Sequence, residues 1–600
     1  MKNFFNVFSY YLIAPIIAFS ILLFYFDFNI FKYGESILFI YTGDGLFAEG
    51  IFKLIIKEGL TYCSKYVGYP QIDTNCFSDY ASNNGYLSFL IVRFFAIFIN
   101  SPLTVTYYQF LLSIFLITIS ANFCLRKIGI SKFNATFLAV LFAITNNRIL
   151  YFYTLSIGNY FIIPFAVLMS LWIMEGKLNI VKINENGKRF FSPNRYFYYC
   201  CIIGSVGSIS SAYYGYACII LLLLSGFILF IRDPKFDKKI FSIAMTAFIL
   251  TLISMLINLS TIIFWIKNGF NDVVGRQPIE GVYHSMSISA LLLPINEHAL
   301  KGFADFSAEF KKIFLFSGEK HFHQFGLFSS IGFCSLLAFA LSLQFLVYKK
   351  DPKYRFYGIE FSKEKYYILG LIASLNLVFA LFFSTESFYL FLQYFFANIR
   401  GLIRLNVVFT FLALTFFGII FDELIAQKKI FKNTIFTKVL IIIICAVALI
   451  DGVGGPTRIS KSFESEKKNY ELSKDFVENI EKSLPMASKI FMMPIKGFPE
   501  FPFDDYKSTI GYIFSEDLKF SYPSPMGRKS YLWQREVADL EFKDFIKKIK
   551  EQGFAGIWIQ RDIFENIEKK IKLKDFENNI KKIAKNSIES RDKIFIFYEI

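Results

Sequence analysis

A single aspartate stands between two glycines shortly after the first long apolar run of this 600-residue chain. It is Asp44, in the stretch YTGDGL (41–46), and a short amphipathic segment follows it. Flanking glycines allow a sharp backbone turn, which brings a carboxylate close to a substrate. Partial desolvation raises the proton affinity of a carboxylate, so Asp44 is a candidate general base for a hydroxyl group. The alternative from the residues alone is that Asp44 caps a helix over 46–58.

Two arginines form a second candidate group. Arg400 and Arg404 are four residues apart in NIRGLIRLN (398–406), on one face of a helix that begins an apolar run. A guanidinium remains charged and offers a planar fork of donors, which favours a phosphate or carboxylate ligand. At a membrane boundary, a lipid-linked phosphate is the natural anion. The alternative is that such an arginine contacts lipid head groups or extends along the apolar surface.

Further polar residues gather near the ends of apolar runs, where burying them costs free energy unless they are paired or used. Glu49 follows Asp44 by five residues, and Asp73 and Asp79 come later in the same loop. Two more groups lie around a turn near residue 146 and in GRQPIEGVYHSMSISALLLPINEH (275–298). Their members are Asn146, Asn147, Arg148 and Asn159, and Arg276, Glu280, His284 and His298.

The elements that carry these residues are expected to be membrane helices. Hydrophobic residues make up 54% of the chain, charged residues only 19%, and the mean hydropathy is +0.45. Apolar runs near 20 residues long match the hydrocarbon core of a bilayer. We therefore expect about 11 transmembrane helices, two of them on either side of Asn146. The other nine are expected at 11–26, 103–125, 197–211, 216–231, 240–264, 327–347, 367–383, 405–421 and 439–450.

The distribution of basic residues sets the expected topology. Lysines and arginines cluster in short loops between apolar runs, at 126–132, 177–195, 232–239, 349–365 and 428–438. Loops of this kind lie in the cytoplasm. The N-terminus is then inside and the C-terminal part outside. The formal net charge of +16 is explained by this cytoplasmic face, so nucleic acid is not an expected partner.

Two domains follow from this topology. A transmembrane domain is expected at 1–451, with outer loops at 29–102 and 265–325, and an extracytoplasmic domain at 452–600. Segments 46–58 and 86–99 are expected to be helices on the outer membrane surface. In the C-terminal domain, predicted strands alternate with predicted helices, which is typical of a small α/β domain. The strands are expected at 489–495, 555–560 and 593–600, and the helices at 462–484, 537–551 and 573–585.

Cysteine usage and metal spacing add little chemistry. Cys63 and Cys76 lie 13 residues apart in the first outer loop. An oxidising compartment would allow a disulfide there, and two free thiols are the alternative. The other six cysteines are in or beside apolar runs, as small packing residues. No metal-ligand spacing is evident and the first outer loop has no Asp-x-Asp pair, so we expect no metal site and no cofactor, and a divalent metal is not favoured.

Five stretches together resemble the GT-C superfamily, the polytopic glycosyltransferases that use lipid-linked sugar donors. Within it they look like a group of bacterial membrane proteins described as sugar translocases or glycosyltransferases. The resemblance spans nearly the whole chain. The stretches are YTGDGL (41–46), SSAYYGY (210–216), GRQPIEGVYHSMSISALLLPINEH (275–298), IRGLIRLNVVF (399–409) and YIFSEDLKFSYPSPMGRKSYLWQ (512–534).

The resemblance implies an α-helical polytopic GT-C-like fold with surface helices in the first outer loop. It implies Asp44 as catalytic base and arginines that hold the donor phosphate, namely Arg400, Arg404 and Arg276. It further implies a polyprenyl-phosphate sugar donor, a glycan or glycolipid acceptor of the cell envelope, and a bacterial inner membrane. Substrate contacts are expected from Glu49, Asp79, Asn147, Arg148, Tyr213, Tyr214, Glu280, His284 and His298.

Two other functions stay open. The chain could be a flippase or transporter of a lipid-linked sugar, or a noncatalytic partner in envelope-glycan assembly. Transporters usually carry internal repeats and polar or broken helices at mid-membrane, and no convincing repeat is present in the sequence.

Overall fold

Helices account for most of the computed structural model of the chain. It describes residues 2–25, 41, 43–61, 63–71, 85–145, 148, 155–183, 188–234, 238–274, 277–296, 298–314, 326–346, 354–356, 358–385, 387–395, 401–427, 434–453, 457–500, 505–564 and 567–600. Each expected membrane segment is helical. These helices are α1 (Lys2–Tyr25), α6 (Pro102–Ile128), α7 (Lys132–Ala143), α10 (Ile162–Met174), α11 (Arg195–Ser210), α12 (Ala212–Arg232), α13 (Lys238–Ile257), α18 (Leu327–Leu346), α19 (Lys363–Phe383), α21 (Asn406–Gln427) and α22 (Thr434–Val453).

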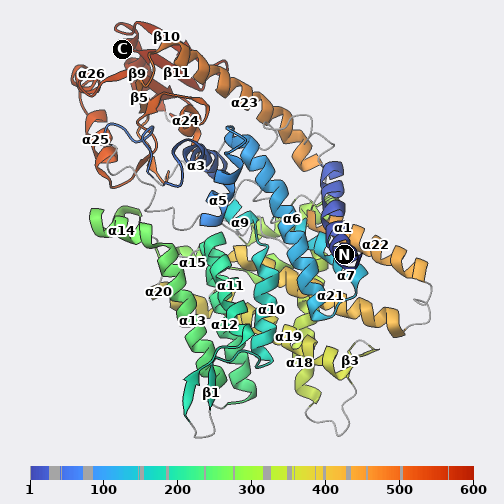
Figure 1. Ribbon diagram of the computed structural model, residues 1–600. Helices are drawn as coiled ribbons and strands as arrows, with labels where there is room; N and C mark the ends of the chain where they lie inside the picture. Colours follow the sequence, from blue (N-terminus) through green and yellow to red (C-terminus); the bar gives the residue numbers. More distant parts are fainter. Residues whose placement is uncertain are drawn as a thin grey trace.

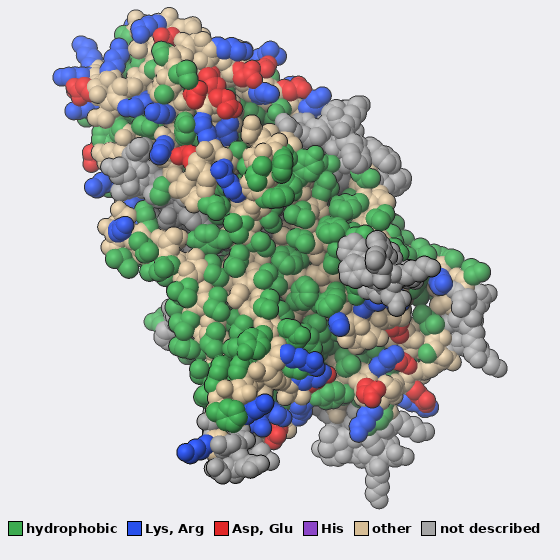
Figure 2. Space-filling view, in the orientation of Figure 1, with side chains coloured by type: hydrophobic (Ala, Val, Ile, Leu, Met, Phe, Trp, Pro, Cys, Tyr) green, Lys and Arg blue, Asp and Glu red, His purple; other side chains and the backbone are tan. Residues whose placement is uncertain are grey.

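The helical bundle has the surface of a multi-pass membrane protein. Among the described residues, six helices are long and apolar enough to cross a membrane, and α1, α7, α10 and α18 contain shorter apolar segments. Hydrophobic side chains cover the middle of the molecule, while charged side chains gather at its two ends (Figure 2). The C-terminal domain forms one end, and the hairpin of β1 (Val181–Ile183) and β2 (Arg189–Phe191) lies at the other (Figure 1).

The apolar run expected to cross at 240–264 is two helices, because it is interrupted at Asn258. The side-chain amide of this residue donates back to the carbonyl of Ser254 at 2.8 Å, and its backbone leaves the helical region. α13 ends before it and α14 (Leu259–Asn268) begins after it. α14 projects away from the bundle toward the C-terminal domain (Figure 1).

The two helices of the first outer loop differ in what they face. α5 (Tyr86–Phe95) buries Phe89 and Val92 and exposes apolar side chains such as Leu90 and Phe94, as a helix at a membrane surface does. In α3 (Asp44–Glu58), nine of 15 residues are buried. α3 packs against α24 (Ile510–Phe514) and η7 (Lys507–Thr509) of the C-terminal domain and against α5 and α6, so it is covered by protein more than α5 is; its place on the membrane surface stays a prediction.

The C-terminal domain is built on a five-stranded sheet with the order β10-β11-β9-β5-β7. β5 (Lys489–Met493) pairs in parallel with β7 (Lys519–Phe520) and β9 (Phe554–Gln560), and β11 (Phe595–Glu599) is antiparallel to β9 and β10 (Asn586–Glu589). Both faces are covered, so the central strands β5, β9 and β11 are apolar except at their ends. The covering helices are α23 (Thr457–Ser483), α25 (Lys529–Ala538), α26 (Phe542–Glu551) and α27 (Ile567–Lys581). The helix expected at 537–551 corresponds to the end of α25 followed by α26.

The first outer loop is part of the same fold as this domain. The backbone N–H of Phe520 in β7 donates to the carbonyl of Tyr66 at 2.7 Å, and the N–H of Tyr69 donates back to Phe520 at 3.2 Å. One apolar core joins α3, α5, α23 and the sheet. The remaining elements are α9 (Leu155–Gly158), η3 (Asp272–Val274), α15 (Glu280–Tyr283), α16 (Ile288–Leu292), α17 (Lys301–Ile313), β3 (Arg355–Phe356), β4 (Ile359–Glu360), α20 (Phe388–Phe395), η5 (Leu402–Leu405), β6 (Gly497–Phe498) and β8 (Ser524–Pro525).

Candidate functional site

The Gly-Asp-Gly stretch begins α3. Gly43 is the residue before the helix, with φ 67° and ψ −154°, a conformation that glycine adopts without strain. Its N–H donates to the carbonyl of Asp505 in the C-terminal domain at 2.8 Å. Asp44 is the first helical residue and is exposed, and no side chain caps the helix at Gly43. The capping position therefore belongs to Gly43, and the Asp44 carboxylate lies at the positive end of the helix dipole.

Glu49 lies below Asp44, between α3 and α6. Its side chain is 2% exposed, and Oε1 accepts a hydrogen bond of 2.6 Å from the Thr106 hydroxyl. Burial raises the pKa of Glu49 to about 8, so the carboxyl is mostly protonated at neutral pH. The hydrogen bond joins α3 to the first turns of α6. Glu49 is therefore not at an open surface, where a substrate contact would lie.

Two of the predicted arginines, Arg148 and Arg404, lie among the described residues. Arg148 is fully buried; its Nε donates to Ser113 Oγ at 2.8 Å, and its guanidinium lies 4.4 Å from the ring centroid of Phe110. Burial lowers the pKa of Arg148 to about 10, which leaves it charged at neutral pH. Arg404, on η5, lies over Tyr213 at 4.9 Å. Tyr213 and Tyr214 are adjacent at the start of α12, so Arg404 lies beside this pair of tyrosines.

Helix α6 connects Glu49 with Arg148. Thr106 contacts Glu49, and Ser113, on the same helix face two turns further along, contacts Arg148. At 1.5 Å per residue, the two contacts are about 10 Å apart along the helix axis. Gln109 lies between them; it is 2% exposed, and within the described part of the chain neither side-chain polar atom has a hydrogen-bond partner. The sequence analysis missed Gln109, although a glutamine inside an apolar run is a signal.

The predicted site residues of the second outer loop lie in different places. The backbone carbonyl of His284 accepts the N–H of Ile403 on η5 at 3.3 Å, which places this part of the loop beside Arg404. Glu280 accepts the N–H of Gln277 at 3.1 Å, close to its own helix start. His298 is buried and paired with Asp451 at the end of α22 (3.2 Å between Nε2 and Oδ1), so it ties the loop to the bundle.

Several expected site residues lie outside the described residues, namely Asp73, Asp79, Asn146, Asn147, Arg276, Arg400 and Cys76. Cys63 is disulfide-bonded. Six further cysteines, Cys124, Cys200, Cys201, Cys218, Cys334 and Cys445, are free thiols. Over the described ranges, no group of three or more His, Cys, Asp or Glu residues has the geometry of a metal site.

The geometry defines the class of protein as a multi-pass α-helical membrane protein with a C-terminal sheet domain on the first outer loop. Solved structures similar to the chain include ArnT from Cupriavidus metallidurans bound to undecaprenyl phosphate, with 10% identity, TM-score 0.49, and coverage of 99% of this chain and 98% of that one. They also include AglB from Archaeoglobus fulgidus with an inhibitory peptide and a dolichol-phosphate (12%, TM-score 0.42, coverage 93% and 70%).

A third similar structure is the arabinofuranosyltransferase AftD from Mycobacteria, with 10% identity, TM-score 0.41 and coverage of 86% of this chain. The chain spans about a third (35%) of the length of AftD. All three are GT-C glycosyltransferases, the superfamily that the sequence motifs resemble. No family model and no curated protein matches the chain.

Proposed function

We propose that the protein is a membrane glycosyltransferase. It takes a sugar from a polyprenyl-phosphate donor at the outer face of a bacterial inner membrane and passes it to a glycan or glycolipid of the cell envelope. The observation that supports this most directly is an exposed carboxylate at the start of α3, a helix that Glu49 joins to α6, together with Arg148 hydrogen-bonded to the same α6 and Arg404 beside Tyr213 of α12.

In this reaction, the Asp44 carboxylate accepts the proton of an acceptor hydroxyl. The hydroxyl oxygen then forms a bond to the anomeric carbon of the donor sugar, and the bond between that carbon and the phosphate oxygen breaks. The polyprenyl phosphate leaves with the electron pair. Arg404 stabilises its charge, with Arg400 and Arg276 as further candidates and Arg148 behind them. A single displacement of this kind inverts the anomeric centre.

Purified protein in vesicles, supplied with a radiolabelled polyprenyl-phosphate sugar and an envelope-lipid extract, tests the proposal. We expect the Asp44→Asn variant to insert and fold normally but to transfer no label. Asp305→Asn, which neutralises an exposed aspartate on α17, is the matched control and should remain active. Full transfer by Asp44→Asn would refute the assignment of the base. Movement of the donor across the vesicle without transfer by the wild-type protein would instead indicate a flippase.

A further inference from the structure

A buried group of charges lies where the parallel strands β5 and β9 end. The Nζ of Lys496 is 2.8 Å from Asp505 Oδ1 and 3.2 Å from Glu500 Oε1, and the side chains of Lys496 and Glu500 are 1% and 0% exposed. Gln560, the last residue of β9, accepts from Lys496 and donates to Asp505 Oδ2, both at 2.8 Å. We call Lys496, Glu500, Asp505 and Gln560 the charge lock.

The charge lock fixes the backbone that holds Gly43. Glu500 Oε2 accepts the N–H groups of Asp505 at 3.1 Å and Tyr506 at 2.9 Å. Tyr506 has φ 51°, a left-handed conformation that is costly for a bulky residue and persists only where surrounding contacts enforce it. The carbonyl of Asp505, between these constraints, accepts the Gly43 N–H. The position of the turn before Asp44 is therefore set from the C-terminal domain.

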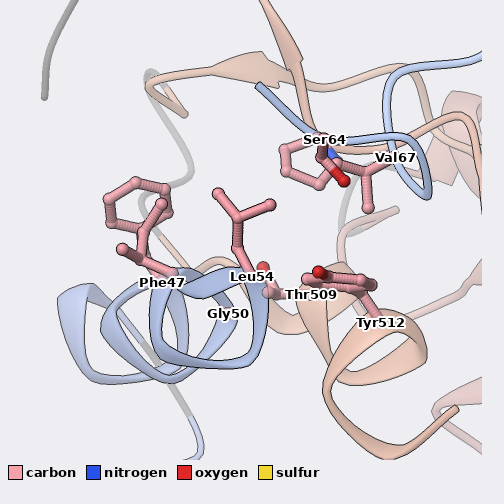
Figure 3. Close-up of a pocket in the computed structure, with 9 residues that line it drawn as sticks. Phe47, Gly50, Leu54, Ser64, Val67, Thr509 and Tyr512 are labelled. Carbon is pink, nitrogen blue, oxygen red and sulfur yellow. The ribbon is translucent and has the colours of Figure 1, made fainter. Parts of the chain in front are cut away.

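Side chains of α3 complete the attachment. The ring of Phe47 stacks on Phe498 with centroids 4.3 Å apart and lies 5.6 Å from Tyr506. One turn further, Gly50 approaches the domain so closely that an added Cβ would be 2.7 Å from Thr509 Cγ2. Figure 3 shows Phe47, Gly50 and Leu54 of α3 facing Thr509 and Tyr512 across a small pocket. The first two turns of α3 are thus held by both backbone and side-chain contacts.

Stability alone does not account for these charges. A buried ion pair contributes little net stability compared with apolar residues of the same volume, because desolvation offsets the attraction. Charged groups do, however, favour one geometry, because a buried charge without its partner costs much free energy. Here the charged groups fix the Asp505 carbonyl that accepts the N–H of Gly43, the residue before the exposed Asp44.

We propose that the charge lock is a positioning device, with Asp505 as its central residue, and that it sets the Asp44 carboxylate for proton transfer. This inference rests on the proposed function of Asp44. A carboxylate displaced by about 1 Å can lose roughly 100-fold in rate without any loss of substrate affinity. The charge lock therefore acts on kcat and not on binding of the donor.

The test compares three variants of the full-length protein in vesicles. Asp505→Ala removes one of the acceptors of Lys496 and one of the acceptors of Gln560. We expect kcat to fall about 10-fold or more with KM for the donor unchanged. Asp505→Asn keeps an oxygen for Lys496 but turns an NH2 group toward Gln560 Nε2, so its kcat should lie between those of Asp505→Ala and the wild type. Arg561→Gln is the matched control: it breaks ion pairs with Glu577 and Glu589 in the same domain and should lower thermal stability while leaving kcat unchanged.

Hydrogen exchange of the amides at 43–48 supplies a readout besides activity. Faster exchange is expected in Asp505→Ala and wild-type exchange in Arg561→Gln. If Asp505→Ala does not fold, Phe47→Leu removes the ring stacking alone and should shift kcat and exchange in the same direction. Wild-type kcat and exchange in Asp505→Ala would overturn the inference. An active Asp44→Asn would overturn the proposed function instead, whatever the exchange data show.

Discussion

The pH dependence of stability offers a sharp test of the contact between α3 and α6. Glu49 has an ordinary pKa of 4.5, which burial raises to about 8 in the folded protein. Between these values the folded state keeps a proton that the unfolded chain releases, so the free energy of unfolding decreases as the pH rises. One pKa unit corresponds to about 1.4 kcal/mol, which gives a loss of about 3 kcal/mol at pH 7 and approaching 5 kcal/mol at pH 9.

Glu49→Gln replaces this carboxyl by a neutral amide of the same shape, which still bonds Thr106 without a titrating proton. Thermal unfolding of the detergent-solubilised protein at pH 5, 7 and 9 measures the effect. We expect the variant to be slightly more stable than the wild type at pH 5 and increasingly more stable at higher pH. Asp44→Asn, which neutralises an exposed carboxylate on the same helix, is the control. A stability gap that is equal at all three pH values would refute the burial argument.

Two further predictions concern the inner part of the site. Gln109→Leu removes a buried amide with no partner among the described residues, so thermal stability should rise by about 1–3 kcal/mol; a decrease in melting temperature would contradict this. Arg404→Gln should raise KM for the polyprenyl-phosphate donor about 10-fold or more, because a charged hydrogen bond to phosphate is lost, with Arg404→Lys intermediate. Arg195→Gln, at the expected cytoplasmic end of α11, is its control, and an unchanged KM in Arg404→Gln would exclude phosphate binding there.

The sequence was most informative where the signal is local. Each expected membrane segment is helical, with 240–264 divided into two helices, because 20-residue apolar runs have few other structures available. The strands at 489–493 and 554–560 lie close to their predicted bounds for a similar reason, since short β-branched and aromatic runs between turn signals favour strands. The break at Asn258 was missed, because a single polar residue barely lowers the hydropathy of the run around it.

Contacts between residues far apart in the chain could not be predicted from the sequence. The amphipathic pattern of 46–58 predicts a helix at a membrane surface, and nothing in that pattern distinguishes a lipid surface from the apolar side of another domain. Residue 67 pairs with residue 520, and Gly43 with Asp505, across more than 400 positions. The same limit applies to His298, whose partner Asp451 lies 153 residues away. A polar residue at a membrane boundary is expected to bind a substrate or to pair with another residue. Only the fold shows which of the two it does.

The two halves of the proposed site reach their positions by different routes. The arginines belong to the helical bundle, through Ser113 on α6 and through η5. The Asp44 carboxylate belongs to α3, which the charge lock holds at Gly43 and which Glu49 holds at Thr106. In the proposed site, these two contacts of one short helix therefore set where Asp44 lies relative to the arginines. Ionisation of Glu49, with its pKa of about 8, makes its burial between α3 and α6 costly, and loss of Asp505 weakens the contact at Gly43. Both changes should act on the same step of the reaction, the transfer of the acceptor proton.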